Sequence, residues 1–334
     1  MEGDAPAVTG QPVDRGDFPG RFDSMVDEIG KVVLGSEDVV RLVLVALIAG
    51  GHVLLEGPPG IGKTLLARSV AKTVGASYRR IQFTPDLMPS DVTGGNVFNQ
   101  QTNAFEFHAG PVFAQLLLGD EINRAPAKTQ AALLEAMSDR QVSIDGETRP
   151  LPSPFFVMAT QNPVESEGTY PLPEAQLDRF LMKLLLGHPA QAVETVLLQR
   201  YVEGFDAADL DGAGLRRVVD AAGVDALRRE ARQVRVDPEV LDYITAVVGR
   251  TRSHPAVDLG ASPRASIALL LCSQVIAASE GRDYVVPDDV KELAPAVLRH
   301  RFLLQPDAEL EGTSADAVVA DVLRDVAVPG GERG

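Results

Sequence analysis

The segment from Gly57 to Thr64 has the residue types and spacing of a phosphate-binding loop, and it reads Gly57-Pro58-Pro59-Gly60-Ile61-Gly62-Lys63-Thr64. Glycines allow backbone N–H groups to turn inward around phosphate oxygens at the positive end of the helix that follows. We expect Lys63 to neutralise charge on the β- and γ-phosphates of ATP, and the Thr64 hydroxyl to ligate Mg²⁺. An apolar run before the loop and a helical pattern after it favour this interpretation over a simple Gly-Pro turn.

An acidic pair, Asp120-Glu121, follows the apolar residues Leu116 to Leu118. At the end of a buried strand, Asp120 is expected to reach the same Mg²⁺ ion, directly or through water. Glu121 is then placed to polarise the water that attacks the terminal phosphate. An acidic pair after a strand is often only a solvated turn, but this pair comes downstream of an independent phosphate-binding loop.

A third polar group ends another apolar run, in the order Ala159-Thr160-Gln161-Asn162-Pro163. Amide side chains at this point are able to orient water or bind the γ-phosphate without adding charge, and we assign that role to Asn162. The competing interpretation is local, because an Asn before a Pro often caps or initiates a turn.

Five segments are the strand candidates that would position these residues: His52 to Glu56, Tyr78 to Phe83, Leu116 to Leu118, Phe155 to Ala159 and Leu181 to Leu186. Helical patterns accompany them, as at Val39 to Ala49, Lys63 to Val74 and Ala127 to Ser138. The alternation predicts an α/β fold, in which helices cover both faces of a parallel sheet. Ligands of such sheets bind beyond the carboxyl ends of the strands.

Two segments interrupt this alternation, and both are predicted to be inserted hairpins. In Gly94 to Gly110, Phe105 and Phe107 lie on one face of an extended segment, where they either contact a substrate or pack the hairpin's own apolar face. In Gln141 to Arg149, the dipeptide Asp145-Gly146 favours a type I′ turn.

Strand patterns fade after His188, and helical patterns dominate the rest of the chain. We therefore divide the chain into four parts: a flexible N-terminal tail at 1–20, an α/β nucleotide-binding core at 21–188, a smaller all-α lid domain at 189–325 and a frayed tail at 326–334. The first part is rich in Gly and Pro and has few apolar side chains to bury.

Composition excludes several classes of protein. The net charge of −16 argues against a surface that binds nucleic acid, although a small basic pore within an acidic ring is compatible with this charge. Cys272 is the single cysteine, so no intrachain disulfide and no zinc site made of thiolates can form. The longest apolar stretches, such as Val39 to Ala49, are shorter than the roughly 20 residues of a membrane-spanning helix. With no signal-peptide pattern at the N-terminus, we expect a cytoplasmic protein.

The ordered set of motifs resembles the MoxR family of AAA+ ATPases from about residue 22 to 320. The resemblance rests on Gly57 to Thr64, Phe83 to Gly94, Asp120-Glu121-Ile-Asn-Arg124, Ala159 to Pro163, Glu174-Ala-Gln-Leu-Asp-Arg179-Phe180 and Gly260-Ala-Ser-Pro-Arg264-Ala265. It implies that Asn162 is the sensor-1 residue, Arg179 the arginine finger and Arg264 the sensor-2 residue of the helical lid. It also implies that the hairpins are the helix-2 insert and the pre-sensor-1 hairpin, which this branch of AAA+ proteins shares with magnesium-chelatase subunits.

Both arginines fit these implied roles chemically. A guanidinium brought in from a neighbouring subunit stabilises the charge that develops on the transferred phosphoryl group. Arg264 follows Pro263, which suits the first turn of a helix, and we expect its side chain to project toward the nucleotide. The simpler alternatives are an intrachain pair of Arg179 with Asp178 or Glu174, and an Arg264 that merely covers a helix flank.

The resemblance implies a hexameric ring that hydrolyses ATP and does chaperone-type work, remodelling or maturing a client protein complex. It also implies a separate partner with a von Willebrand factor A domain, because this chain has no Asp-x-Ser-x-Ser motif of its own. Two alternatives stay open: a chelatase-like subunit that drives metal insertion, and a nucleotide-gated scaffold with little turnover. A DNA motor is disfavoured by the acidic charge, and a GTPase by the lack of an Asn-Lys-x-Asp element.

Overall fold

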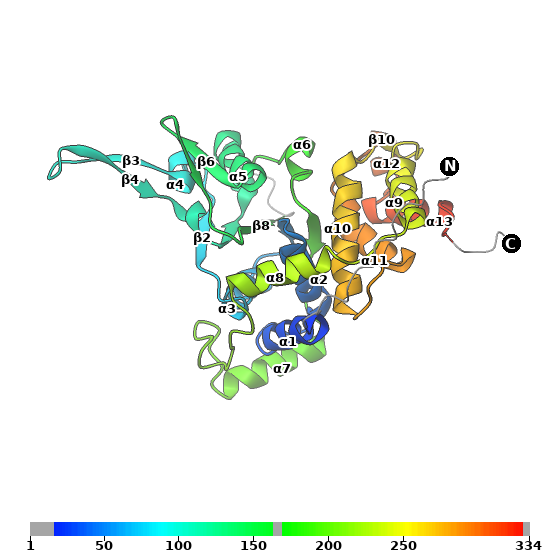
Figure 1. The fold of residues 1–334 in the computed structure, drawn as a ribbon, viewed down its shortest axis with the longest axis horizontal. Helices are drawn as coiled ribbons and strands as arrows, with labels where there is room; N and C mark the ends of the chain where they lie inside the picture. The colour runs from blue at the N-terminus through cyan, green and yellow to red at the C-terminus, as the bar shows by residue number, and fades with distance from the viewer. Residues whose placement is uncertain (1–16, 163–168, 330–334) are drawn as a thin grey trace, which may run out of the picture.

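The computed structural model of the chain describes residues 17–162 and 169–329. At its centre lies a sheet of five parallel strands in the order β2-β5-β8-β1-β9 (Figure 1). The strands are β1 (Val53–Glu56), β2 (Tyr78–Gln82), β5 (Leu116–Asp120), β8 (Phe156–Gln161) and β9 (Met182–Leu185). Each overlaps one of the five predicted strand segments, and the predicted α/β fold is confirmed.

Helices cover both faces of the sheet, and its central strands β5 and β8 are buried along nearly their whole length. One face packs against α1 (Phe18–Gly30), α2 (Glu37–Ala49) and α3 (Lys63–Thr73), through strand residues such as Val53 and Leu55. The other face packs against α5 (Ala127–Asp139), through residues such as Leu54 and Leu117. Successive side chains of a strand point to opposite faces, which explains how a continuous apolar run supplies both cores.

Both inserted segments form two-stranded hairpins. The first consists of β3 (Gly94–Asn99) and β4 (Ala104–Ala109), which follow the short helix α4 (Pro89–Thr93) and extend well away from the sheet (Figure 1). The second consists of β6 (Gln141–Ile144) and β7 (Glu147–Pro150). Asp145 and Gly146 both have positive φ, 50° and 84°, as a type I′ turn requires.

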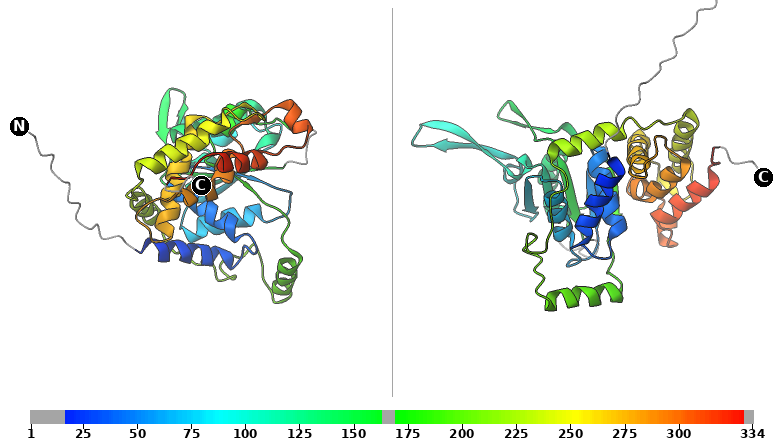
Figure 2. Two further views of the ribbon diagram at one scale, coloured as in Figure 1. Left: turned by 90° about the vertical axis from the view of Figure 1, so that its right-hand side faces the viewer. Right: turned by 60° about the horizontal axis from the view of Figure 1, so that its bottom comes forward.

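Helices make up most of the chain after β9, as the sequence predicts, and Figure 2 shows α9 to α13 gathered beside the sheet. They are α7 (Gln191–Val202), α8 (Ala221–Ala231), α9 (Pro238–Thr251), α10 (Pro263–Ser279), α11 (Pro287–Leu298), α12 (Pro306–Leu310) and α13 (Ala315–Asp325). The small pair β10 (Val257–Leu259) and β11 (Leu303–Leu304) joins two of their connections. The remaining short elements are η1 (Pro111–Phe113), η2 (Ile122–Arg124) and α6 (Glu174–Leu177).

The helical part shares a hydrophobic core with one face of the sheet. Helix α10 packs against α1 and α2, and α11 packs against β9. Buried residues of α10 and α11, such as Leu269 and Leu293, belong to the same apolar cluster as Val53 of β1. The helices after α8 are therefore packed onto the sheet and are not joined to it by a linker alone.

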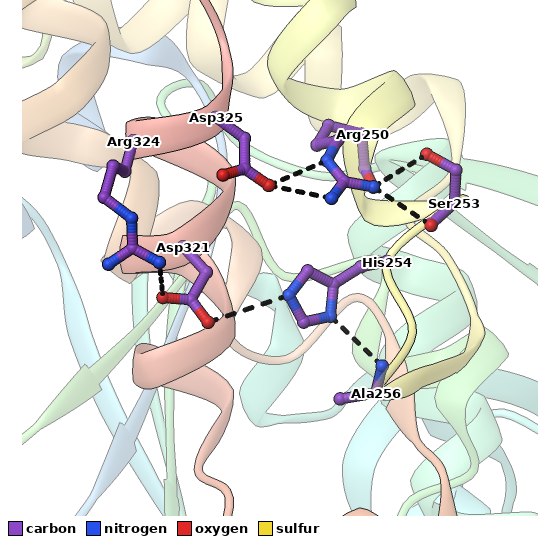
Figure 3. Close-up of polar contacts among 7 residues, drawn as sticks. All are labelled: Arg250, Ser253, His254, Ala256, Asp321, Arg324 and Asp325. Atoms are coloured by element: carbon purple, nitrogen blue, oxygen red, sulfur yellow. Dashed lines mark hydrogen bonds and ion pairs between the residues drawn. The ribbon is translucent and has the colours of Figure 1, made fainter.

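A polar cluster holds the last helix, α13, on α9 (Figure 3). Arg250 donates through Nε and Nη2 to Asp325 Oδ2, and its Nη1 donates to the Ser253 carbonyl. His254 Nδ1 accepts from the Ala256 N–H at 3.2 Å, which leaves Nε2 facing Asp321 at 3.8 Å. The arginine also lowers the pKa of Asp325 through a side-chain hydrogen bond.

The N-terminal tail was predicted too long, because α1 already begins at Phe18. Asp17 Oδ1 accepts from the Gly20 N–H at 3.0 Å, and Pro19 lies in the first turn, where its missing N–H costs nothing. Phe18 is buried and its ring stacks on Phe22. Averaging composition over 1–20 hid this helix start, and residues 1–16 lie outside the described residues.

Among residues 17–162 and 169–329, none of the helices has both the length and the apolar composition of a membrane span.

Candidate functional site

The glycine-rich loop lies between the carboxyl end of β1 and the start of α3. Gly62 is the N-cap of α3 with φ of 91°, and no side chain caps this helix end. Gly60 has φ of 81°, and a Cβ at Gly60 or Gly62 would meet no other atom within 4 Å, so the loop faces open space there. The first N–H groups of α3 are consequently presented to a ligand, as an anion site requires. At Gly57 the constraint is steric, since a Cβ would lie 2.4 Å from the Leu186 carbonyl oxygen.

A cavity of about 240 Å³, here called the Lys63 cavity, opens in front of this loop. It brings the loop together with residues from the carboxyl ends of three neighbouring strands. Its lining consists of Pro59, Gly60, Gly62, Lys63, Thr64, Arg80, Asp120, Glu121 and Asn162. Lys63, Thr64, Asp120, Glu121 and Asn162 were all expected at one site from the sequence, and the fold places them around one space.

Lys63 is buried, and its Nζ donates to the Gly57 carbonyl at 2.6 Å. Burial lowers the pKa of Lys63, while the carboxylates of Asp120, Glu121 and Glu56 act in the opposite direction. An ammonium group that has lost part of its hydration is strongly stabilised by an anion in the same cavity. This environment suits the neutralisation of phosphate charge.

The Asp120 carboxylate is held by two neighbours at the end of β5. Thr160 Oγ1 donates to Asp120 Oδ1 at 2.6 Å, and the same hydroxyl accepts from the Glu121 N–H at 2.8 Å. Arg80 donates to Asp120 Oδ2 through Nη2 at 2.6 Å and Nε at 3.2 Å. The carboxyl group is thereby fixed in a single orientation toward the cavity.

The donor set fits Mg²⁺. The Asp120 carboxylate and the Thr64 hydroxyl both line the Lys63 cavity, and Mg²⁺ prefers oxygen ligands. In proteins Mg²⁺ is usually held by one or two such groups together with substrate phosphates, in contrast to an all-protein cage. The described part of the chain has no group of three or more His, Cys, Asp or Glu residues that could hold a metal ion.

Glu121 adopts a left-handed backbone conformation with φ of 57°, which turns the chain sharply after β5. Its Oε2 accepts from Gln82 Nε2 at 2.8 Å and from Arg124 Nη1 at 3.1 Å. Asn162, at the end of β8, is buried and engaged in an interaction within the protein. Pro163 and the residues up to 168 lie outside the described residues.

The sequence analysis missed Arg80 and Gln82 of β2. They lie on one face of the strand, since they are two residues apart, and Gln82 is in register with Asp120 of β5. The available signal was the alternation of polar and apolar residues at the end of this run, but recognising its meaning requires knowing that β2 and β5 are neighbours.

Arg179 and Arg264 do not line the Lys63 cavity. They lie with Arg140 and Arg301 around a second cavity of about 390 Å³, which also touches Gly51, His52 and Leu181 at the amino ends of β1 and β9. We call Arg140, Arg179 and Arg264 the arginine face. The four residues of β1 separate it from the glycine-rich loop by about 13 Å, at roughly 3.3 Å per residue.

Arg264 therefore lies away from the Lys63 cavity of its own chain, and its expected projection toward the nucleotide stays a prediction. Pro263 and Ser262 do begin α10, with Ser262 Oγ accepting from the Arg264 N–H at 3.2 Å. The helix start, however, lies over the opposite edge of the sheet, and Arg264 Nη1 is 3.7 Å from Asp178 Oδ2. Local sequence marks where a helix begins but not which edge of a sheet it faces.

A larger cavity of about 740 Å³ adjoins the glycine-rich loop on its other side. It shares Pro59, Gly60, Gly62 and Thr64 with the Lys63 cavity, and Ile61 also lines it. The remaining lining is mostly apolar and includes Val32, Val33, Leu65, Val193 and Leu197. A charged half and an apolar half thus meet at one loop, as a ligand with a polyphosphate and a planar base requires.

Comparisons with known proteins agree with this geometry. Residues 52–182 match the family model "ATPase family associated with various cellular activities (AAA)", and residues 249–322 match an AAA lid domain. The chain is 49% identical to YeaC, an uncharacterized protein of Bacillus subtilis, covering 91% of this chain and 93% of YeaC. It is 43% identical to chaperone MoxR1 of Mycobacterium tuberculosis, over 90% of this chain and 81% of that protein.

More distant similarity points the same way. The chain is 33% identical to protein MoxR of Methylorubrum extorquens, over 90% of this chain and 91% of that protein. The crystal structure of a suspected ATPase from Cytophaga hutchinsonii superimposes with a TM-score of 0.86 at 41% identity, covering 93% of this chain and 96% of that one. The similarity therefore includes the sheet, the helical part and the connection between them.

Proposed function

Because the chain belongs to the MoxR family of AAA+ ATPases, we propose that it binds ATP with Mg²⁺ and hydrolyses the nucleotide at the Lys63 cavity. The observation that carries the proposal is the convergence of Lys63 and Thr64 with Asp120, Glu121 and Asn162 around one space. The base of the nucleotide would occupy the adjoining apolar cavity, and the phosphates would face the start of α3.

Each residue has a defined task in this proposal. Lys63 neutralises charge on the β- and γ-phosphates, and Thr64 and Asp120 would hold Mg²⁺, which would supply further charge neutralisation when bound. Glu121 takes the proton of the water whose oxygen attacks the γ-phosphorus, and the bond to the β-phosphate oxygen breaks to release ADP and phosphate. Asn162 orients that water or the γ-phosphate.

The arginine face supports a site shared between subunits. Arg179 and Arg264 lie near the amino ends of the strands, whereas the glycine-rich loop lies at their carboxyl ends. Neither arginine can therefore complete the site of its own chain. In a ring, the arginine face of one subunit would meet the Lys63 cavity of the next, and Arg179 would act there as an arginine finger. A hexamer is the proposed assembly.

We further propose that ATP turnover remodels a client protein complex, together with a separate partner that carries a von Willebrand factor A domain. The support is that one relative is named a chaperone, and that the helical part is packed against the sheet, where it can respond to the nucleotide.

The test is nucleotide binding and phosphate release by the purified protein, with and without Mg²⁺. Tight binding of ATP and ADP with Mg²⁺, and turnover that chelation abolishes, are the expected results. GTP in place of ATP and added DNA are the controls that separate this reading from a GTPase and a DNA motor. A protein with no affinity for adenine nucleotides in the presence of Mg²⁺ would overturn the proposal.

A further inference from the structure

Arg301 is a buried arginine that the proposed reaction does not use. It follows α11 in the helical part, and its side chain is 2% exposed. Burying a guanidinium is strongly unfavourable unless it is paired and hydrogen-bonded. Its partners therefore indicate what it is buried for.

All of these partners belong to the residues on either side of Arg179. Arg301 Nη1 donates to Asp178 Oδ1 at 2.8 Å, and Nη2 donates to the carbonyl oxygens of Phe180 at 2.6 Å and Leu181 at 3.4 Å. The planar guanidinium thus holds the residue before Arg179 by its side chain and the residues after it by their backbone. A lysine could not make these contacts at once, because its donors lie on one point.

Other residues of the helical part also form hydrogen bonds to the residues that flank Arg179. Ser262, the N-cap of α10, donates through Oγ to Asp178 Oδ2 at 2.9 Å. His300 Nε2 lies 3.0 Å from the Phe180 carbonyl, which makes this nitrogen the donor. Arg179 itself donates through Nη1 to the Leu134 carbonyl of α5 at 2.7 Å, so its side chain contacts the α/β core and not the helical part.

We infer that Arg301 is a positioning residue, through which the helical part sets the place of Arg179. The inference rests on the proposed role of Arg179 as a finger acting on the neighbouring subunit. A shift of α10 and α11 against the sheet would move Asp178 and Phe180, and with them the arginine between them. Nucleotide bound in one subunit would thereby adjust the finger that this subunit offers to the next.

Subunit mixing separates this role from a merely structural one. Arg301→Met should lower kcat at least ~10-fold, as expected if an effect worth ~10³ to 10⁵ is partly lost. Its affinity for ATP should stay within about twofold, because its Lys63 cavity is untouched. When Arg301→Met is mixed with Lys63→Ala, in which the contacts around Arg179 are intact, turnover should return.

The decisive mixtures contain Arg179→Ala, whose own Lys63 cavity is intact. Lys63→Ala should restore turnover to it, whereas the double variant Lys63→Ala/Arg301→Met should not. The matched control is Lys63→Ala/Arg282→Met, which breaks another arginine cluster of the helical part, with Asp289 and Glu280, and should rescue as well as Lys63→Ala.

Equal rescue by the Arg301 double variant and by Lys63→Ala would overturn this inference alone. Failure of Lys63→Ala itself to rescue Arg179→Ala would overturn the shared site, and the inference with it. If Arg301→Met does not fold, Arg301→Lys keeps the charge and takes its place in the same mixture. Rescue weaker than that by Lys63→Ala is then expected, and full rescue would contradict the assignment.

Discussion

At the scale of single residues, Lys63 is the group on which nucleotide affinity should depend most. Its buried ammonium and the N–H groups of α3 face the same cavity. Lys63→Ala removes a charge-assisted contact worth about 1.5 to 3 kcal/mol, so ATP affinity should fall about 10- to 100-fold. A fluorescent ATP analogue titrated in the presence of Mg²⁺ measures this. Lys128→Ala, an exposed lysine of α5, is the control that should bind normally.

Glu121 should separate binding from chemistry. Glu121→Gln keeps the size and polarity of the side chain but removes the base that accepts the proton of water. Turnover should fall by about 10² to 10⁴, while ATP still binds. Single-turnover phosphate release and equilibrium binding, measured on the same sample, give the two numbers. Loss of both together would argue that Glu121 shapes the site and is not the base. Because this variant should retain ATP in an assembled ring, it is also the bait of choice for capturing the client complex.

The residue scale also shows what sequence can and cannot predict. Gly57 to Thr64 and Asp120-Glu121 were identified because their chemistry depends on neighbours in the chain. Arg80 and Gln82 were missed because their roles depend on which strand pairs with β5. Arg264 was recognised as a helix-start arginine, but the sequence did not show at which end of the strands it lies, because that is decided by how α10 packs on α1 and α2.

At the scale of elements, His52 joins three of them and should make stability depend on pH. Its Nδ1 accepts from the Val157 N–H of β8 at 3.0 Å, so Nε2 donates to the Met137 carbonyl of α5 at 3.1 Å. Burial lowers the pKa of His52 from 6.5 to about 4. Between these two values the unfolded chain binds the proton that the folded chain refuses, so stability is lost as pH falls from about 6.5 toward 4.

The size of this effect can be measured with His52→Asn, whose side-chain oxygen can still accept from Val157. Between pH 7.5 and 5.5 the wild type should lose about 1 kcal/mol more unfolding free energy than the variant, at about 1.4 kcal/mol per pH unit for one proton. Urea unfolding at the two pH values gives the comparison. Parallel pH profiles of the two proteins would show that His52 does not carry the dependence. Burial also lowers the pKa of His300, but this residue is present in both the wild type and the variant.

The order of elements was predictable, whereas their packing was not. The strands and hairpins followed from apolar runs and from the Asp145-Gly146 turn, which are local signals. The shared core of α10, α11 and the sheet is a property of contacts between distant segments. It means that any nucleotide-driven motion of the helical part must slide packed helices past one another, since no bare linker separates them.

At the scale of the whole molecule, the proposed action of the arginine face on the Lys63 cavity of a neighbouring subunit would make activity a property of the assembly. Specific ATPase activity should therefore fall when the protein is diluted, because isolated subunits lack a finger at their site. Turnover measured across a wide range of protein concentration, with sedimentation velocity at the same concentrations, tests this. A rate per subunit that is independent of concentration while the protein dissociates would contradict it.

The positions of these two surfaces also restrict the symmetry of that assembly. A twofold contact can pair each Lys63 cavity with the arginine face of the other subunit only reciprocally, which limits the assembly to a dimer. A head-to-tail contact joins the same two surfaces between successive subunits, and it continues indefinitely unless its rotation closes on itself. The angle between neighbours, fixed by the shape of the two edges, thus decides between a closed circle and an open helical filament.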